Sequence, residues 1–438
     1  MEFTKVCVIG LGYIGLPTAC TFATHGLYVV GVDINTHVIS TLRNGGIHIN
    51  EPGLRLLVRE AVDSGRLTVN ETPEDADAFI IAVPTPFFEH DMGIYTGKAY
   101  RLADMGAVTA ATESIVAHLR PGNLVVLEST SPPCTTVDLV RPILERSGLK
   151  AGSDFHLVYS PERVLPGKII QELTENARVI GGIDKSSSEA GRDLYAHFVK
   201  GEIVLTDATT AEMVKLMENT YRDVNIAIAN EFSRLAERFG VDIWEAIAIA
   251  NRHPRVKILK PGPGVGGHCI SVDPWFLVEA APDLTELITA ARHVNDGQPQ
   301  FVINLGKRMI GDDLNGKRIA ALGLAFKPDV DDLRESPAID VTKLLVEAGA
   351  MVRCYEPYKL DAEIPGVNTE ATVEDAIRDA DVLMLLVGHR ELLELDPAKL
   401  RQITPARWAI DTVGGWERQI WTKAGFNIIR LGDGKSNL

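Results

Sequence analysis

The chain has 438 residues, of which 44 are Lys or Arg and 59 are Asp or Glu, so its formal net charge at pH 7 is −15. An acidic balance without a long basic run argues against a nucleic-acid-binding function, and no segment has the uninterrupted apolar length of a membrane span. The length predicts two or three domains. Five cysteines without a CxxC pair indicate a reducing compartment, and "MEFTKVCVIGLGYIG" is typical of a first strand rather than a signal peptide. We therefore expect a soluble cytoplasmic protein.

Short β-branched runs alternate with helical patterns over the first part of the chain. The strands that we expect there cover residues 5–12, 28–33, 78–86, 124–130, 155–162 and 177–182. Short apolar strands separated by helices predict a parallel sheet with helices on both faces.

The sequence pattern changes from alternating strands and helices to helices after this series. From Thr209 to Phe239 there is no Gly or Pro, and apolar residues recur at helical spacing, which predicts one long helix. Helical patterns also cover 243–251 and 286–310, and a second strand and helix series follows "GDDLNGK". We expect an α/β fold of two Rossmann-like parallel-sheet domains joined by a helical central domain. The expected divisions are 1–205, 206–310 and 311–438.

The stretch "VCVIGLGYIGLPTACTFATHG" carries Gly10, Gly12 and Gly15 after a strand and before a helix. In a dinucleotide fingerprint the first glycine permits the tight turn, the second lets the backbone approach a pyrophosphate, and the third lets helix and strand pack closely. Asp33 ends the next strand, where a carboxylate hydrogen-bonds a ribose 2′-hydroxyl and repels a 2′-phosphate. The pattern predicts NAD as cofactor.

Two threonines follow later strands of the same series. Thr85 in "VPTP" and Thr130 in "EST" lie at carboxyl ends of strands, where the ligand crevice of such a sheet opens. Ordinary turn and cap residues are the alternative for each of them alone. The residues expected to bind the cofactor in this part of the chain are Gly10, Gly12, Tyr13, Ile14, Gly15, Asp33, Thr85 and Thr130.

A lysine, an asparagine and a glutamate are candidates for catalysis. Lys215 and Asn219 are four residues apart on the long helix and therefore share one face. Most exposed helical lysines are merely solvated, so this pair alone is weak evidence. Glu162 in "SPERVLPG" lies just beyond a strand end, a crevice position, although a carboxylate at a helix start is an equal alternative.

Cys269 stands in the glycine-rich "GVGGHCISVD", with Asp273 four residues on. A buried cysteine is most often inert, but so many glycines indicate a loop whose backbone approaches a ligand. Zinc would require more ligands, and Cys269, His253 and His268 lack the usual paired spacing, so we expect no metal. A nucleophilic thiolate needs nearby positive charge, which Lys215 supplies if the fold brings it close. Asp273 is better suited to orient a water or another catalytic group.

Together these motifs resemble a known family. GxGxxG near the N-terminus, "SPE", Lys and Asn four apart on a central helix, "GxGGxC" with an aspartate four beyond, and "GLAFKPDVDDLRESPA" are similar to the UDP-glucose and GDP-mannose dehydrogenases. The motifs occur in the family's order and cover nearly the whole chain.

The resemblance implies a four-electron oxidation of the C6 hydroxymethyl group of a nucleotide sugar, with two NAD⁺ used in succession at one site. Cys269 is then the nucleophile that forms a thiohemiacetal and a thioester. Lys215 and Asn219 stabilise oxyanions, and Glu162 and Asp273 handle or orient the proton transfers and the hydrolytic water. Thr130 has a supporting role.

The third segment repeats the strand-then-turn layout without the second and third fingerprint glycines, so we do not expect a second NAD site there. The resemblance implies that this domain binds uridine diphosphate through Lys327 and that Arg334 approaches the cofactor or substrate phosphates. A surface loop of paired charges is the alternative for "KPDVDDLR".

Two variations within the motifs concern the sugar. "SPERVLPGK" replaces the glucose branch's "NPEFLREG", and Val272 replaces a lysine of its "GGxCxPKD". Both variants resemble the N-acetylhexosamine branch, and "PERVLPG" is more similar to the enzymes acting on UDP-N-acetyl-D-mannosamine than to those acting on UDP-N-acetylglucosamine. A hydroxyl-to-acetamido change demands room and a new polar partner. The expected substrate-binding residues are Arg163, Val164, Lys215, Asn219, Arg255, Gly266 and Lys327, with His253 and Arg292 as further candidates.

The long helix carries more apolar residues than one face needs, among them Met213, Met217, Val224, Ile228, Phe232 and Leu235. The resemblance implies that this region forms a dimer core, so we expect a homodimer or a higher homo-oligomer, in which Arg255 or Arg292 of one subunit reaches the other's site. Burial of the helix against the chain's own two domains is the alternative.

Overall fold

A computed structural model describes residues 1–49, 51–267 and 269–435. The chain divides into two compact units. The first comprises Met1–Glu218 and Trp275–Leu284, and the second comprises Asn219–Pro274 and Thr285–Leu438. Among the described residues, no helix combines the length and the apolar character that crossing a bilayer requires.

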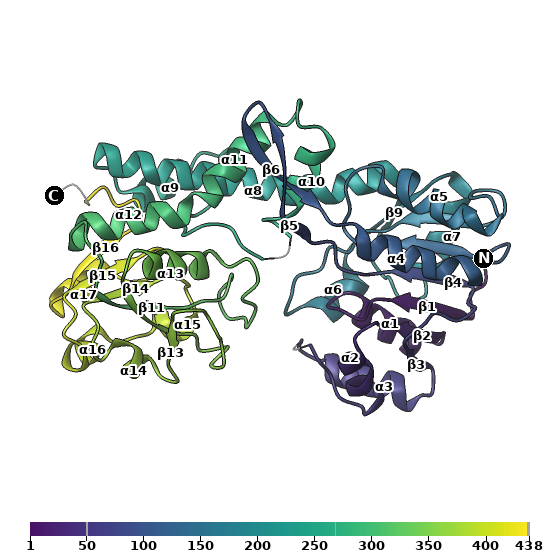
Figure 1. Cartoon of the computed structure of the whole chain (residues 1–438), viewed down its shortest axis with the longest axis horizontal. Helices are drawn as coiled ribbons and strands as arrows, with labels where there is room; N and C mark the ends of the chain where they lie inside the picture. Colours follow the sequence, from purple (N-terminus) through teal and green to yellow (C-terminus); the bar gives the residue numbers. More distant parts are fainter. Residues whose placement is uncertain (50, 268, 436–438) are drawn as a thin grey trace. The chain divides into compact units, whose positions relative to one another are not determined.

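The first unit is built on one large sheet (Figure 1). Its strands are β1 (Lys5–Ile9), β2 (Tyr28–Val32), β3 (Leu67–Asn70), β4 (Ala78–Ile81), β7 (Leu124–Leu127), β8 (His156–Tyr159), β9 (Arg178–Gly182) and β10 (Ile203–Asp207). They lie in the order β10-β9-β8-β7-β4-β1-β2-β3, and the strands from β8 to β3 are parallel. This confirms the doubly covered parallel sheet, because β4 and β7 are buried along their whole length.

Helices form a layer on each face of this sheet. They are α1 (Gly15–Thr24), α2 (Thr36–Arg43), α3 (Leu54–Asp63), α4 (Gly106–Ile115), α5 (Arg141–Leu144), α6 (Ile169–Glu175) and α7 (Lys185–Tyr195). Val8 of β1 shares one apolar core with Phe22 of α1, and the neighbouring Ile9 shares the other core with Ile115 of α4. Successive side chains of a strand point to opposite faces, which gives the unit two cores.

Strand β9 differs from the expected parallel arrangement. It pairs antiparallel with β8, Val158 facing Gly182 and Tyr159 facing Gly181. Segment 160–177, with the short helix α6, leaves β8 at its carboxyl end and enters β9 at that same end of the strands. A parallel neighbour would need a crossover to the opposite end of the strands. Extending the antiparallel register places Arg178 opposite Glu162.

The sequence reading missed a β-hairpin of β5 (Phe87–Tyr95) and β6 (Lys98–Ala103). Thr96 and Gly97 at its turn both have positive φ, as a two-residue hairpin loop requires. Two contacts hold its base to α10 (Asp273–Ala280): Ala103 N donates to Glu279 at 2.9 Å, and the Phe87 and Phe276 rings lie 5.6 Å apart.

The expected long helix is α8 (Ala208–Phe239), which carries the chain from the first unit into the second. The other helices of the middle region are α9 (Ile243–Ala250), α11 (Glu286–Asp296) and α12 (Gln298–Ile310). The helical pattern over 286–310 is thus two helices that meet at Gly297. Pro299 lies in the first turn of α12, where its missing N–H costs no helical hydrogen bond.

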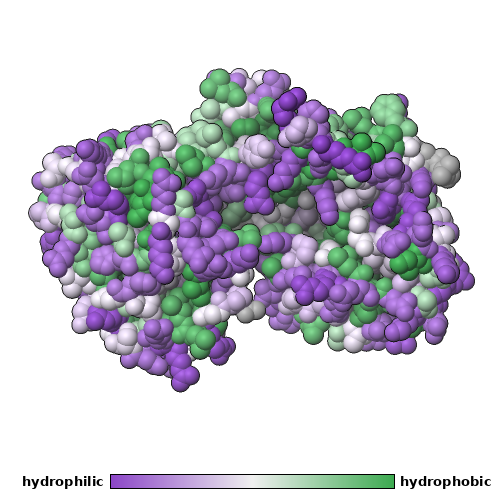
Figure 2. Space-filling model, turned by 180° about the vertical axis from the view of Figure 1, so that it is seen from behind, coloured by the Kyte–Doolittle hydropathy of each residue, from purple (hydrophilic) through white to green (hydrophobic). Residues whose placement is uncertain are grey.

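The second unit contains the second parallel sheet (Figure 1). Its strands are β11 (Arg318–Leu322), β12 (Met351–Tyr355), β13 (Asn368–Thr369), β14 (Val382–Leu385), β15 (Trp408–Asp411) and β16 (Asn427–Arg430), in the order β13-β12-β11-β14-β15-β16. Its helices are α13 (Pro337–Glu347), α14 (Val373–Ile377), α15 (Arg390–Leu393), α16 (Pro397–Ile403) and α17 (Arg418–Lys423). All neighbouring strands are parallel, as expected. On the face drawn in Figure 2, hydrophilic residues predominate and hydrophobic ones form separate patches.

Candidate active site

The turn after β1 requires glycine at two positions. Gly10 has φ +92°, and a Cβ there would lie 2.6 Å from the Ala82 oxygen. A Cβ on Gly15 would lie 1.8 Å from the Gly10 oxygen, so α1 starts this close to the strand only with glycine. Gly12 differs, because a Cβ there would meet nothing within 4 Å. A glycine that the protein's own packing does not require fits the close approach of a pyrophosphate.

The expected cofactor-binding residues follow the carboxyl ends of neighbouring parallel strands. The glycine turn with the half-buried Tyr13 and Ile14 follows β1, Asp33 follows β2, and Thr85 and Thr130 follow β4 and β7. The Asp33 carboxylate accepts hydrogen bonds from Leu11 N at 2.9 Å and Asn35 N at 2.8 Å, which ties the glycine turn to β2. The structure thus brings these residues to the sheet edge where dinucleotide crevices open.

Gly12→Ala separates cofactor binding from folding. We expect its free energy of unfolding to stay within about 0.5 kcal/mol of wild type, because the added methyl meets no protein atom. NAD⁺ affinity should fall at least about tenfold, since the methyl occupies the path of the pyrophosphate. Urea unfolding and calorimetric titration with NAD⁺ measure the two effects. Gly15→Ala is the contrasting variant and should lose stability as well, whereas wild-type NAD⁺ affinity in Gly12→Ala would contradict the assignment.

Glu162 follows β8 at the same sheet edge, and its side chain is 9% exposed. Its Oε1 accepts from Arg163 N at 2.7 Å, and its Oε2 accepts from Arg178 Nη1 at 2.7 Å. The Arg178 guanidinium also donates to Ser160 Oγ at 2.9 Å and to Glu128, whose Oε1 accepts from the Tyr195 hydroxyl at 2.5 Å. The sequence reading missed this cluster. The available signal was a charged residue beside each of two apolar strand runs: Glu128 directly follows "LVVL", and Arg178 directly precedes "VIGG".

Residues Arg163 and Val164 face the protein. Arg163 Nη1 donates to Glu218 Oε1 at 2.7 Å and its Nη2 donates to Ala177 O, while Val164 packs against the first core. The loop that follows is anchored by Glu51, whose buried carboxylate accepts from Gly167 N at 2.8 Å and Ile169 N at 2.9 Å. The backbone of the "RVLPGK" loop is therefore held in a defined shape.

The two helix α8 candidates are both buried. Lys215, in the first unit, is 7% exposed and forms no ion pair with any residue that the structure describes. Asn219, in the second unit, donates through Nδ2 to Asp273 Oδ2 at 2.6 Å, and Asp273 is itself buried at the start of α10. The structure thus pairs Asn219 with Asp273.

Cys269 is exposed in the turn that leads into α10. Its carbonyl accepts from Val272 N at 3.1 Å and Asp273 N at 2.8 Å, so the turn connects the thiol to the Asn219–Asp273 pair. The glycines before it let the loop approach another segment of the second unit: a Cβ on Gly266 would lie 2.3 Å from Glu335 O, and one on Gly267 would lie 2.7 Å from the Phe326 ring. Glycine is needed here for a close approach to protein, not only to ligand.

That neighbouring segment, 326–335, contains Lys327 and Arg334. Lys327 is half-buried, and the exposed Arg334 donates to both oxygens of Asp332, at 2.8 and 2.7 Å. Asp329 and Glu335 have φ of +60° and +48°, a region that residues with a Cβ rarely occupy. Such conformations cluster at functional loops. The structure brings Cys269, Asp273, Asn219 and this segment together within the second unit.

Arg292 does not line a pocket. It is 1% exposed and donates to Asp223 Oδ1 at 2.5 Å and to Asp296. The interpretation as a sugar-binding or intersubunit arginine is therefore wrong, since its charge is neutralised between α8 and α11. His253 and Arg255 are exposed after α9, where Arg255 N donates to His253 Nδ1 at 3.4 Å.

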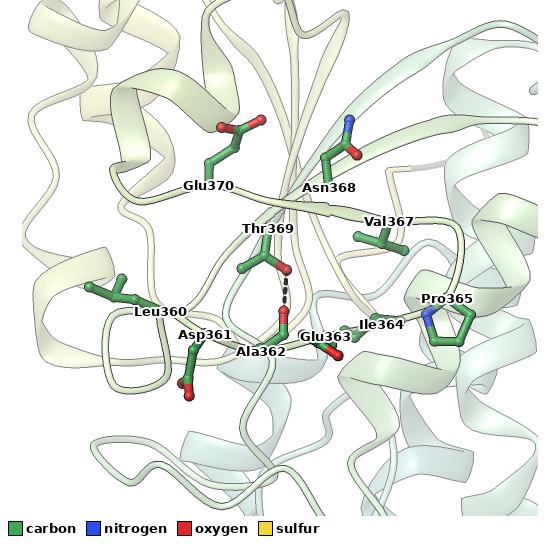
Figure 3. A pocket seen from close by; sticks show the side chains of 10 residues that line it. All are labelled: Leu360, Asp361, Ala362, Glu363, Ile364, Pro365, Val367, Asn368, Thr369 and Glu370. Atoms are coloured by element: carbon green, nitrogen blue, oxygen red, sulfur yellow. Dashed lines mark hydrogen bonds between the residues drawn. The ribbon is translucent and has the colours of Figure 1, made fainter.

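A surface hollow of about 810 Å³ lies beside β13 in the second unit, lined by residues of the single segment 360–370 (Figure 3). Thr369 Oγ1 donates to Ala362 O at 2.7 Å across it. Its lining includes Asp361, Glu363 and Glu370 and none of the predicted site residues, so the hollow does not suit a diphosphate. In the described part of the chain, His, Cys, Asp and Glu side chains form no group of metal-ligand type, and His268 lies outside it.

Comparison with known proteins identifies the family of this chain. Residues 4–199 match the UDP-glucose/GDP-mannose dehydrogenase family NAD binding domain, 209–297 its central domain, and 320–418 its UDP binding domain. The chain is 46% identical over 435 residues to a UDP-N-acetyl-D-mannosamine dehydrogenase from Methanocaldococcus jannaschii, covering 99% of this chain and 97% of the relative. An NDP-N-acetyl-D-galactosaminuronic acid dehydrogenase from Ralstonia nicotianae is 46% identical over 95% of this chain and 97% of its own length.

A solved structure of UDP-D-ManNAc dehydrogenase from Pyrococcus horikoshii superposes with a TM-score of 0.89 at 38% identity, covering 98% of this chain and 100% of that one. The chain thus shares its overall fold with that solved structure. The chain belongs to the UDP-glucose/GDP-mannose dehydrogenase family and carries that family's NAD binding domain.

Proposed function

We propose that this protein oxidises the C6 hydroxyl group of UDP-N-acetyl-D-mannosamine to the carboxylate of UDP-N-acetyl-D-mannosaminuronate, with two NAD⁺ per sugar. The observation that carries the proposal is the exposed Cys269 in a turn that ends at Asp273, whose carboxylate is held by Asn219. A two-electron dehydrogenase does not require a thiol, whereas a four-electron oxidation at one site needs a covalent anchor for the aldehyde.

The proposed chemistry balances in four steps. The alcohol loses a hydride and a proton to give the aldehyde, and Cys269 adds to the aldehyde as a thiohemiacetal. The thiohemiacetal loses a second hydride and its hydroxyl proton to give the thioester, and water then releases the carboxylate, the thiol and a proton. NAD⁺, when bound, accepts each hydride. Buried Lys215 suits an oxyanion, because no described residue neutralises it, and the Asn219 amide assists. Glu162 and Asp273 handle the protons and the hydrolytic water, and Thr130 supports them.

The remaining predicted residues serve binding in this proposal. Tyr13, Ile14 and Arg334 contribute to the cofactor site, and Arg255, Gly266 and Lys327 to the sugar nucleotide. Arg163 and Val164 contribute to the sugar site through their backbone, because their side chains face the protein. The division into 1–205, 206–310 and 311–438 assigns cofactor, catalytic loop and uridine diphosphate to successive segments, and the product belongs to polysaccharide biosynthesis in the cytoplasm.

The choice of sugar rests on "PERVLPG" and Val272 together with the relatives' names. Glu51 holds the backbone of the "RVLPGK" loop, so the loop presents a defined backbone surface to the sugar. UDP-N-acetylglucosamine and UDP-glucose are the alternatives by the same mechanism.

A panel of UDP sugars read by NADH stoichiometry tests the proposal. We expect two NADH per UDP-N-acetyl-D-mannosamine, with kcat/KM at least about tenfold above that for UDP-N-acetylglucosamine or UDP-glucose. A higher kcat/KM for either alternative would reassign the sugar. One NADH per sugar would contradict the mechanism, and cofactor binding without NADH formation on every sugar would favour a non-catalytic sensor.

We also propose a homodimer or a higher homo-oligomer built on α8. Tyr221, Ile228, Phe232, Leu235 and Phe239 are exposed and recur at helical spacing along one side of the helix. A contiguous exposed apolar stripe is typical of a subunit interface, and it disfavours the alternative in which the chain's own domains bury it. Phe232→Glu should convert the assembly to monomers in light scattering, and a wild-type monomer would contradict the proposal.

A further inference from the structure

The first unit contains a buried cluster of four side chains, Arg178, Glu128, Ser160 and Tyr195, which contacts Glu162 through Arg178. Arg178 is 4% exposed and Glu128 is fully buried. The guanidinium reaches Glu162, Ser160 and Glu128 by hydrogen bonds and lies 3.7 Å from the centroid of the Tyr195 ring. The antiparallel pairing of β9 with β8 brings the start of β9, at Arg178, to the end of β8 that Glu162 follows.

One guanidinium therefore serves two carboxylates. Burial raises the pKa of Glu128 to about 7, with the Arg178 charge opposing the rise and the Glu162 charge adding to it. Oε2 of Glu128 makes no hydrogen bond to any described residue, so a proton there breaks no contact. Burial also raises the pKa of Tyr195 well above its usual range, which keeps its hydroxyl a donor to Glu128.

The charged and titratable groups that face Glu128 come from three elements. Arg178 comes from β9, Tyr195 from α7, and Glu162 from the loop after β8. The neighbouring Arg163 directs its guanidinium to Glu218 and Ala177 O. Among the carboxylates that the structure describes, Glu128 thus shares the Arg178 charge with Glu162 alone.

We propose that Arg178 is the positioning residue of Glu162 and that Glu128 sets how much of the guanidinium charge Glu162 receives. The inference rests on the proposed function, in which Glu162 handles protons and the hydrolytic water. With Glu128 protonated, Arg178 pairs with Glu162 alone and makes it a weaker base. With Glu128 ionised, the charge is shared and Glu162 is a stronger base, so water attack on the thioester accelerates through neutral pH.

Glu128→Gln tests this with the intact protein. The single-turnover rate of carboxylate formation from UDP-N-acetyl-D-mannosamine is measured from pH 6 to pH 8. We expect the ratio of wild-type to variant rate to be about 1 at pH 6 and to rise to roughly 3–10 at pH 8, because the glutamine fixes the neutral state. A merely structural role for Glu128 would lower the rate by the same factor at every pH, which would overturn the proposal.

Glu279→Gln is the matched control. Burial also raises the pKa of the Glu279 carboxyl, which accepts a hydrogen bond from Ala103 N and takes no part in the Arg178 cluster. Its rate ratio to wild type should not change with pH. A ratio that changes as it does in Glu128→Gln would also overturn the proposal.

Arg178 is tested by two substitutions. Arg178→Gln should lower kcat roughly 100-fold and leave KM for NAD⁺ within about twofold, because Glu162 loses its orientation and its counter-charge. Arg178→Lys should recover only part of kcat, since one ammonium cannot reproduce the guanidinium fork. An equal loss in kcat and NAD⁺ affinity would indicate general disorder. If Arg178→Gln does not fold, Glu128→Gln decides the question alone.

A titration separates this inference from the proposed function. Carboxyl ¹³C NMR of labelled glutamate, with Glu162→Gln for assignment, follows the Glu162 signal through pH 7. If the chemical shift of this signal changes near pH 7 in wild type and not in Glu128→Gln, the shared charge is supported even if no sugar is oxidised. The inference is overturned if the chemical shift does not change near pH 7. It is also overturned if the shift changes in an active protein but the rate of carboxylate formation does not change with it.

Discussion

Cys269→Ala is expected to abolish net oxidation, with the rate of carboxylate formation at least about 10³-fold below wild type. Without the thiol the aldehyde has no covalent anchor, so the second hydride transfer and the hydrolysis lose their substrate. Cys269→Ser should fail similarly, because a hydroxyl is a poorer nucleophile than a thiolate. Stopped-flow NADH formation together with product analysis by mass spectrometry measures the effect.

The other cysteines supply the controls. Burial raises the pKa of Cys7 to about 11 and those of Cys20 and Cys354 to about 12, so these thiols stay protonated and inert. Cys134 is partly exposed and is the matched control. Cys134→Ser should keep oxidation and the two-NADH stoichiometry, and a fully active Cys269→Ala protein would refute the covalent mechanism. Lys215→Ala should instead accumulate the thioester, visible as a mass adduct on Cys269.

Arg292→Ala is expected to destabilise the second unit by about 3–5 kcal/mol, because it leaves a buried carboxylate without its counter-charge. Asp223 Oδ1 accepts from Arg292 at 2.5 Å and from Asn295 Nδ2 at 2.8 Å. Asn230 continues the network, donating to Asn295 Oδ1 at 2.9 Å and accepting from Gly262 N at 3.0 Å. Loss of Arg292 should therefore also weaken the hydrogen bonds that hold Gly262, at the start of the Cys269 loop. Urea unfolding at pH 7 measures the loss.

This destabilisation should shrink as the pH falls. Burial already raises the pKa of Asp223 above its usual value, with Arg292 opposing the rise. Without Arg292 the native state binds a proton that the unfolded state releases, so stability increases as pH decreases from the native pKa toward the unfolded one. Arg292→Met combined with Asp223→Leu removes both charges and should recover most of the stability. Equal losses in the single and double variants would contradict the ion-pair account.

Predictions from short segments of sequence hold where the chemistry is local. The Gly10–Gly15 turn, the long α8 and the strand ends before Asp33, Thr85, Thr130 and Glu162 are each encoded within about 20 consecutive residues. That Cys269 lies in a turn and not inside a helix also follows from its glycine neighbours. The roles of these residues stay predictions.

Pairings between distant segments were not readable in this way. The β5–β6 hairpin is a local pairing that was also missed, although Thr96 and Gly97 mark its turn, because the flanking residues lack a clear apolar alternation. Arg292 looked like a ligand-binding arginine, because its partner Asp223 lies 69 residues away in sequence.

The sequence by itself determined the fold class, the cofactor turn and the residues that the family resemblance marks as catalytic, because each depends on spacing along one segment. Only the tertiary structure decided that Arg292 is buried in an ion pair and that β9 runs antiparallel to β8. It also decided that Arg178 contacts both Glu162 and Glu128. The physical reason is desolvation: whether a charged side chain binds a ligand or pairs inside the protein depends on what surrounds it, and its surroundings come from parts of the chain far away in sequence.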